Sequence, residues 1–128
     1  MILGIDVSTY LEELENGAKY YVDGKQVDPL VVMNANGVDH MRIRLWNNPF
    51  DPNGVKYLGG TCDVNNFLTL AKLAQSKGYK ILLDFHYSDF WVDPAKQFPP
   101  KAWCNFNLEQ LVQAVYDFTK DTLLQARE

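Results

Sequence analysis

Cysteine and histidine are scarce in this chain of 128 residues, which contains two of each. Cys62 and Cys104 form no CxxC pair, and His40 and His86 lie far apart in the sequence. Because zinc sites group such ligands at short, regular spacings, we expect neither a metal centre nor a cofactor. Both cysteines fall in segments predicted to be loops. One disulfide would be compatible with that placement, but two unpaired thiols are the expected state.

Excess positive charge and long apolar runs are also lacking. The formal net charge is −4 at pH 7, whereas nucleic acid selects a basic surface, so we expect no nucleic-acid partner. No apolar stretch approaches the roughly 20 residues of a membrane-spanning helix, so no membrane partner is expected. Met1 leads directly into an apolar segment, which predicts no secretory signal. Such a start fits both a cytosolic protein and a mature chain with an added Met.

Three apolar segments with strand character alternate with helical segments. The strands, each expected to be buried, are predicted at Ile2–Asp6, at His40–Leu45 and from Lys80 onward. Helices are predicted from a Thr9–Glu12 capping box to Asn16, from Asp28–Pro29 to Gly37, from Asp63 to Gly78, and from an Asn107–Gln110 capping box to near the end, with a hairpin turn at Asp23–Gly24. This order predicts one α/β domain over residues 1–128, with right-handed βαβ units and a parallel sheet.

The last predicted helix carries an apolar stripe that is expected to be buried. Its residues are Leu108, Leu111, Val112, Val115 and Phe118. The connections differ in length. Those from helix to strand are short, whereas Trp46–Cys62 and His86–Phe106, which follow strands, are long and contain the unusual residues. Long loops at the carboxyl ends of parallel strands are typical of a ligand site, so we place function there.

Charged residues share one face of the predicted sheet. Arg42 and Arg44 alternate with apolar residues, and they point the same way as Asp6, Asp84 and His86. Buried charge is costly unless it is paired or hydrogen-bonded. Two interpretations remain open: a network that only shapes the interior, or an arginine that holds a catalytic carboxylate ionised and in place.

Aromatic residues gather in or beside the two long loops. They are Trp46, Phe50, Tyr57, Tyr87, Phe90, Trp91 and Trp103, and they are interleaved with Asn47, Asn48, Asp51, Asn53, Ser88 and Asp89. Some of them must pack the loops down. The mixture of aromatic rings with amides and carboxylates is nevertheless typical of a carbohydrate cleft, whereas a nucleic-acid site would replace the acidic groups by Lys and Arg.

Glycoside hydrolysis normally needs two carboxyl groups that flank the scissile bond. All five glutamates, Glu12, Glu13, Glu15, Glu109 and Glu128, fall on predicted helices rather than at strand ends. Aspartates are better placed, and a catalytic pair of Asp6 and Asp89 stays open as an alternative.

Several segments resemble the N-terminal part of the endo-β-1,4-galactanases, glycoside hydrolase family 53. The resemblance rests on Gly4–Ser8, Gly37–Pro49, Leu82–Trp91, Asp93–Gln97 and Pro100–Trp103, in order along the whole chain. It implies the first three βα units of a (β/α)8 TIM barrel, truncated before strand four. It also implies a retaining enzyme, extracellular in its parent form, that cleaves β-1,4-galactan of type I arabinogalactan and pectin, with β-1,4-galactan or galacto-oligosaccharide as its partner.

The resemblance also assigns residues. The two catalytic glutamates of the family lie beyond the C-terminus of this chain, so no catalytic residue is assigned and the chain is expected to be inactive alone; no metal ligand is assigned either. Residues expected to support the active site are Asp6, Arg42, Arg44, Asp84 and His86, of which Arg42 matches an arginine that contacts the nucleophile. Residues expected to bind substrate are Trp46, Asn47, Tyr87, Asp89 and Trp91.

Two other classes of function remain. One is a non-catalytic small α/β module that binds carbohydrate through the aromatic loops. Self-association is a related expectation, because a three-strand sheet leaves open edges. The other is a small flavodoxin-like domain, which the loop after the first strand disfavours because it lacks a phosphate-binding glycine pattern.

Overall fold

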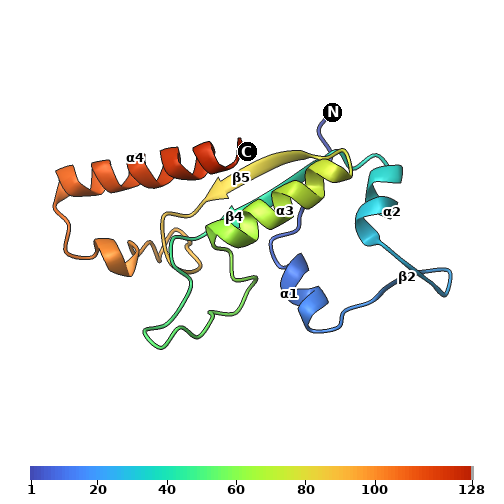
Figure 1. The fold of residues 1–128 in the computed structure, drawn as a ribbon, viewed down its shortest axis with the longest axis horizontal. Helices are drawn as coiled ribbons and strands as arrows, with labels where there is room; N and C mark the ends of the chain where they lie inside the picture. Colours follow the sequence, from blue (N-terminus) through green and yellow to red (C-terminus); the bar gives the residue numbers. More distant parts are fainter. Residues whose placement is uncertain (128) are drawn as a thin grey trace.

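A three-stranded parallel sheet lies at the centre of the computed structural model, which describes residues 1–127. The strands β1 (Gly4–Asp6), β4 (His40–Leu45) and β5 (Lys80–Phe85) are ordered β1-β4-β5, with β4 in the middle (Figure 1). Their register sets Asp6 beside Arg42 and Arg44 beside Asp84. The parallel pairing predicted from the alternation of strands and helices is confirmed.

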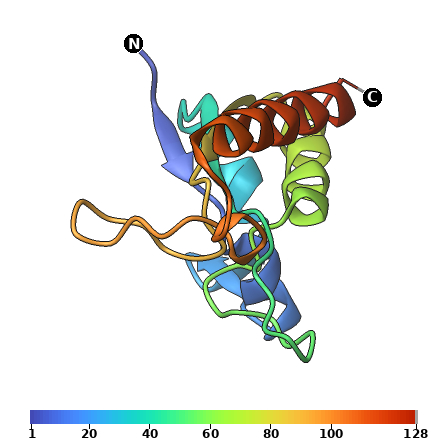
Figure 2. The same ribbon diagram turned by 90° about the vertical axis from the view of Figure 1, so that its left-hand side faces the viewer.

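Helices and one hairpin connect the strands. In chain order these are α1 (Tyr10–Glu15), the antiparallel pair β2 (Tyr20–Val22) and β3 (Lys25–Val27), α2 (Pro29–Ala35), α3 (Val64–Ser76), the 3₁₀ helix η1 (Lys101–Trp103) and α4 (Leu108–Gln125). The helix α3 packs against β4 and β5. The connection between β5 and η1 projects from the body of the molecule (Figure 2).

The predicted helix starts are mostly confirmed. Asp28 accepts a hydrogen bond from the Leu30 backbone at 2.9 Å, Asp63 accepts one from the Asn66 backbone at 2.8 Å, and Asn107 forms a capping box with Gln110. These bonds satisfy backbone N–H groups that have no partner within the helix.

The capping box predicted at Thr9 is wrong. The Thr9 side chain accepts no backbone bond and instead donates its hydroxyl hydrogen to Glu13 at 2.6 Å. The Glu12 carboxylate, expected to reach back to Thr9, accepts from the backbone N–H of Gly60. A contact 48 residues away in the chain has therefore replaced the local one.

The core lies between the sheet and the helices. Met41, Ile43 and Leu45 of β4 are at most 1 % exposed and pack with Phe67 and Leu70 of α3. The apolar face of β4 thus meets the helices, as the alternation predicted, and the arginines of the same strand point to the other face.

Burial was predicted incorrectly for the outer strands and for the start of α4. Ile2, which precedes β1, is 73 % exposed, and Leu82 is 57 % exposed because it shares with Arg42 the face of the sheet that α3 does not cover. Leu108 and Val112 are 77 % and 64 % exposed. The helix α4 reaches the core farther along, where Phe118 packs against Phe85, Tyr87 and Trp103.

No helix within residues 1–127 has both the length and the apolar character that a membrane span requires. Cys62 is buried, Cys104 is exposed, and both are free thiols.

Candidate functional site

Arg42 joins carboxylates from the two neighbouring strands. Its Nη1 donates to Asp6 Oδ2 and its Nη2 donates to Asp84 Oδ2. One residue from each of β1, β4 and β5 therefore meets on the face that α3 does not cover. The charged face predicted from the sequence is formed, and a guanidinium that binds two carboxylates is held in a fixed orientation.

The Asp6 carboxylate also accepts hydrogen bonds from Ser8, whose backbone N–H lies 2.9 Å from Oδ1. Burial raises the pKa of Asp6, but the bonds from Ser8 and the Arg42 guanidinium outweigh this effect and hold the pKa below its ordinary value. Asp6 is therefore ionised at neutral pH and is a poor proton donor.

His86 is held between Trp46 and Asp84. The Trp46 indole donates to His86 Nδ1 at 3.1 Å, and His86 Nε2 lies 3.1 Å from Asp84 Oδ2. Because Nδ1 accepts a hydrogen bond, the proton of the neutral ring sits on Nε2. Burial lowers the pKa of His86, and although Asp84 opposes this effect, the neighbouring Arg44 and Arg42 add to it. The ring is therefore a neutral donor to Asp84.

Arg44 has a different environment from Arg42. It is 3 % exposed, and its guanidinium carbon lies 3.7 Å from the centroid of the Trp91 ring. Its Nη2 donates to the carbonyl of Gly59 at 2.8 Å. None of the ion pairs found among residues 1–127 includes Arg44. Arg44 therefore supports a tryptophan, and only Arg42 has the predicted contact with carboxylates.

Trp91 and Phe90 present aromatic surface at the carboxyl end of β5, where they are 45 % and 38 % exposed. Trp46 is fully buried, and its ring packs against Phe90 at 5.3 Å and edge-on against Trp91 at 5.7 Å. Trp46 was predicted to bind substrate, but it lies beneath the exposed rings rather than among them.

Two cavities flank this aromatic surface. One of about 380 Å³ is lined by Tyr57, Phe90 and Trp91, and the other, of about 640 Å³, is lined by Arg42, Asp84 and His86. Phe98 and Pro99 line both cavities, so the aromatic surface and the charged network are adjacent parts of one face. Volumes of about 300–1,000 Å³ are typical of small-molecule sites.

The other predicted substrate-binding residues connect loops. Asp89 is 6 % exposed, accepts from the Asn48 backbone at 2.9 Å, and accepts from the backbone and Nζ of Lys101 at 2.8 and 2.7 Å. The Asn47 N–H donates to the Ser88 carbonyl at 2.8 Å. With three hydrogen bonds already accepted by its carboxylate, Asp89 is badly placed for the catalytic pair with Asp6 that the sequence left open.

Tyr87 turns toward the helix α4. Its backbone has a φ of 48°, its ring stacks on Phe85 with centroids 5.4 Å apart, and its hydroxyl lies 2.8 Å from that of Thr119. It also lines the larger cavity, so its role in binding substrate stays a prediction.

Sequence reasoning missed Ser8, Gly59 and Gly60. Ser8 Oγ is buried and accepts from the Arg44 backbone at 2.8 Å. A Cβ on Gly60 would lie 2.5 Å from the Ser8 carbonyl oxygen, and one on Gly59 would lie 3.1 Å from the Trp91 indole nitrogen. Both glycines also have φ above 100°, so only glycine suits them. The adjacent glycine pair in a long loop was the available signal.

Comparisons with known proteins all indicate the same family. The family model described as "Glycosyl hydrolase family 53" matches residues 2–128. The chain is 43% identical over 123 residues to an endo-β-1,4-galactanase of Bacillus subtilis, which covers 95% of this chain and 29% of the relative. It is 44% identical to an arabinogalactan endo-β-1,4-galactanase of Cellvibrio japonicus, which covers 94% of this chain and 31% of that protein.

A solved structure extends the likeness to the fold. The GH53 catalytic domain of Ignisphaera aggregans superposes with a TM-score of 0.94 at 43% identity, over 98% of this chain and 35% of that one. This chain therefore spans about a third of the proteins it resembles. The superposition confirms the predicted fold, which is three βα units of a (β/α)8 barrel.

Proposed function

Because this chain belongs to glycosyl hydrolase family 53, we propose that it forms one wall of the cleft in which an endo-β-1,4-galactanase binds and cleaves β-1,4-galactan. The chain covers 29% of one matched galactanase and 31% of the other. We therefore assign the activity of a complete galactanase to this protein as a proposal.

The contact between Trp91 and Arg44 is the observation that supports this function most directly. The indole is 45 % exposed, and a buried guanidinium backs it at 3.7 Å. The apolar C–H face of a pyranose ring stacks on such a surface, while the fixed ring loses little entropy on binding. Trp91 follows β5 at its carboxyl end, where ligands of parallel α/β folds bind.

The charged network supports a positioning role rather than a catalytic one. A retaining glycosidase needs one carboxyl group as a nucleophile and a second as an acid, about 5–5.5 Å apart. Asp6 and Asp84 both bind Arg42, and Glu12, Glu13, Glu15 and Glu109 lie on α1 and α4. We infer that the two glutamates that the family resemblance implies come from outside these three βα units. Asp6 and Asp84 then orient Arg42 toward the nucleophile.

Binding and turnover of galactan test the two parts of this function separately. Affinity electrophoresis of the 128-residue protein should show retardation by β-1,4-galactan and less by β-1,4-glucan, and Trp91→Ala should abolish the difference. The same sample should release no reducing sugar from galactan. Equal migration in both gels would overturn the proposed binding. Release of sugar that Asp6→Asn or Asp89→Asn removes would overturn the placement of the catalytic groups.

A non-catalytic module that binds carbohydrate is the second candidate. It is favoured by a half-exposed aromatic surface beside carboxylates that are all engaged with Arg42, Lys101 or Ser8. Fusion of this chain to strands four to eight of a matched galactanase would separate the two candidates. Turnover by the fusion that depends on Arg42 supports the galactanase assignment, and a folded fusion that binds galactan but does not cleave it supports the module.

A further inference from the structure

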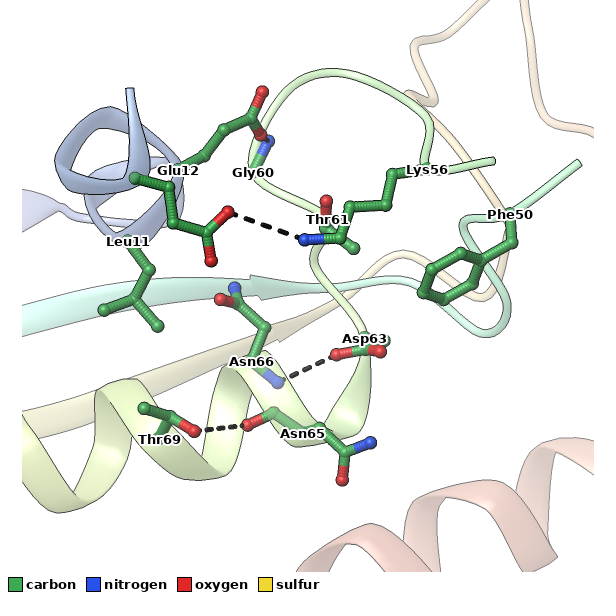
Figure 3. Close-up of a pocket in the computed structure, with 11 residues that line it drawn as sticks. Leu11, Glu12, Phe50, Lys56, Gly60, Thr61, Asp63, Asn65, Asn66 and Thr69 are labelled. Atoms are coloured by element: carbon green, nitrogen blue, oxygen red, sulfur yellow. Dashed lines mark hydrogen bonds and ion pairs between the residues drawn. The ribbon is translucent and has the colours of Figure 1, made fainter. Parts of the chain in front are cut away.

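A second cavity lies on the helix side of the sheet, away from the Arg42 network. It has a volume of about 310 Å³, and it is enclosed by α1, by the loop that follows β4 and by the first turns of α3 (Figure 3). We call it the α1–α3 site. The elements that enclose it belong to two successive βα units of this chain, so the cavity is complete without further strands.

One buried amide in this cavity has no partner. Nδ2 of Asn66 is inaccessible to solvent and donates no hydrogen bond to any group of residues 1–127, although the Asn66 backbone N–H donates to Asp63 at 2.8 Å. Figure 3 shows the Asn66 side chain extending from α3 toward α1, on the side where Leu11 lies. A buried donor without an acceptor costs free energy, so a rotation of this side chain that brings Nδ2 to a ligand oxygen in the cavity would stabilise the complex.

The remaining polar groups in the cavity define the chemistry of that ligand. Glu12, Glu15 and Asp63 contribute carboxylates, and Lys56 lies 3.5 Å from Glu15. This excess of negative charge disfavours phosphates, sulfates and uronates. Among residues 1–127 no group of three His, Cys, Asp or Glu side chains could hold a metal ion. The ligand that fits is neutral, with several hydroxyl donors for the carboxylates and an oxygen acceptor for Asn66.

An aromatic ring completes the site. Phe50 lines the cavity and belongs to none of the aromatic pairs found within residues 1–127, so it adds an aromatic side chain to the polar lining. A pyranose ring has both an apolar face and a rim of hydroxyl groups, so it satisfies Phe50 and the carboxylates together.

The loop that encloses the cavity is held in an unusual conformation. Gly59, Gly60 and Thr61 all have positive φ, and the value of 44° at Thr61 is rare for a β-branched residue. The Glu12 carboxylate fixes this conformation by accepting from the Gly60 N–H. The same loop carries Tyr57, which packs against Phe90 of the aromatic surface at 5.6 Å, so the loop connects the two sites.

We propose that the α1–α3 site is a second carbohydrate-binding site, distinct from the Trp91 surface, that takes one neutral pyranosyl unit of a polysaccharide. The choice of galactan as that polysaccharide rests on the proposed function. A site outside the cleft would hold a polymer on the protein while another part of it enters the cleft.

The test titrates the ¹⁵N-labelled chain with β-1,4-galactotetraose and follows the side-chain NH₂ signals of Asn66 and the indole signal of Trp91. Both should shift, with independent dissociation constants. In the variants, the backbone amide signal of Thr61, which lines the cavity, reports binding at the α1–α3 site. Asn66→Ala and Phe50→Ala should each weaken this binding by about 3–10-fold, as expected for one hydrogen bond or one ring contact. Binding at Trp91 should not change in these variants. Gln113→Ala, on an exposed face of α4, is the matched control.

The outcomes separate this inference from the proposed function. A shift at Trp91 with none at Asn66 or Thr61 overturns the second site and leaves the galactanase cleft intact. A shift at Asn66 that persists in Trp91→Ala, without any shift at Trp91 in the parent chain, supports the second site and overturns the cleft. No shift at either position, in a chain whose spectrum shows it folded, overturns both.

Discussion

The guanidinium of Arg44 stacks on the indole of Trp91 with 3.7 Å between the guanidinium carbon and the ring centroid. The two residues are 47 positions apart in the chain, and Gly59, which accepts from Arg44 at 2.8 Å, comes from a third segment. Within residues 1–127 this buried cation has no carboxylate partner, so it depends on the rings of Trp91 and Trp46 and on a carbonyl group for its stabilisation. This relationship ties the β4 strand to the aromatic surface at the end of β5.

Replacement of Arg44 by Met should destabilise the fold and loosen Trp91. We expect a loss of about 1–2 kcal/mol in the free energy of unfolding, because a desolvated cation–π contact and a hydrogen bond are removed together. Urea denaturation measures the loss of stability, and a red shift of the tryptophan emission would report greater solvent exposure of the Trp91 ring. Lys120→Met is the control, because Lys120 is exposed and lies 5.7 Å from the Tyr116 ring. Equal effects of both variants would contradict the role given to Arg44.

His86 should titrate below the ordinary histidine value of about 6.5. Burial lowers the pKa of His86, and the hydrogen bond from Trp46 to Nδ1 requires the neutral ring. The unfolded chain then binds more protons than the folded one just below pH 6.5, so stability falls as the pH drops from there through the lower pKa of the folded state. Acid titration of the ring signals by NMR should show the proton of the neutral form on Nε2.

Trp46→Phe provides the matched variant for this prediction, because it keeps an aromatic ring but removes the indole N–H. The pKa of His86 should rise in this variant, and the stability should depend less on pH below 6.5. An unchanged pKa would mean that the bond between Trp46 and His86 does not select the neutral ring.

The sequence allowed the charged face to be predicted, but it did not separate its two arginines. The alternation in His40–Leu45 placed Arg42 and Arg44 on one side, and the register with β1 and β5 brought Asp6 and Asp84 to Arg42. The partners of Arg44 come from loops, whose paths depend on tertiary contacts rather than on periodicity. The same limit applies to Trp46. It lies in a segment whose composition predicted a cleft, but its side chain is fully buried.

The exposure of the outer strands could not be predicted from the local sequence pattern, for another reason. Periodicity indicates which face of a strand is apolar, but not whether a neighbour covers it. Ile81 and Leu82 are 38 % and 57 % exposed on β5, which within residues 1–127 pairs only with β4. The glycine pair at Gly59–Gly60 was visible in the sequence, but only the structure shows that Ser8 and Trp91 approach it.

The open edges of the sheet lead to a prediction about self-association. In the described chain β1 and β5 each have one unpaired edge, and Leu82 is exposed on β5. Unpaired apolar edges associate with other strands, so sedimentation velocity should show dimers or larger species that increase with concentration. Leu82→Lys should reduce this association, whereas Val55→Lys, at a loop position that is 61 % exposed, should not. A monomer at high concentration would contradict the prediction.

The last prediction concerns Asp89, which the sequence allowed as a catalytic group and the structure connects to two loops. Its two oxygens accept from the Asn48 backbone and from both nitrogens of Lys101, at 2.7–2.9 Å. Asp89→Asn places an amide NH₂ against these donors and removes the charge. We therefore expect a loss of about 1.5–3 kcal/mol in stability, the contribution typical of hydrogen bonds to a charged group.

Asp93→Asn is the control for this change, because Asp93 is exposed and its carboxylate accepts, within residues 1–127, only a local bond from the Ala95 backbone at 2.8 Å. Urea denaturation should show little change for Asp93→Asn, since surface substitutions usually alter stability by less than about 0.5 kcal/mol. If Asp89 were instead a catalytic carboxylate, Asp89→Asn would leave stability unchanged or raise it, because active-site charges are held at a cost to the fold. The sign of the stability change thus decides between the two roles without any assay of turnover.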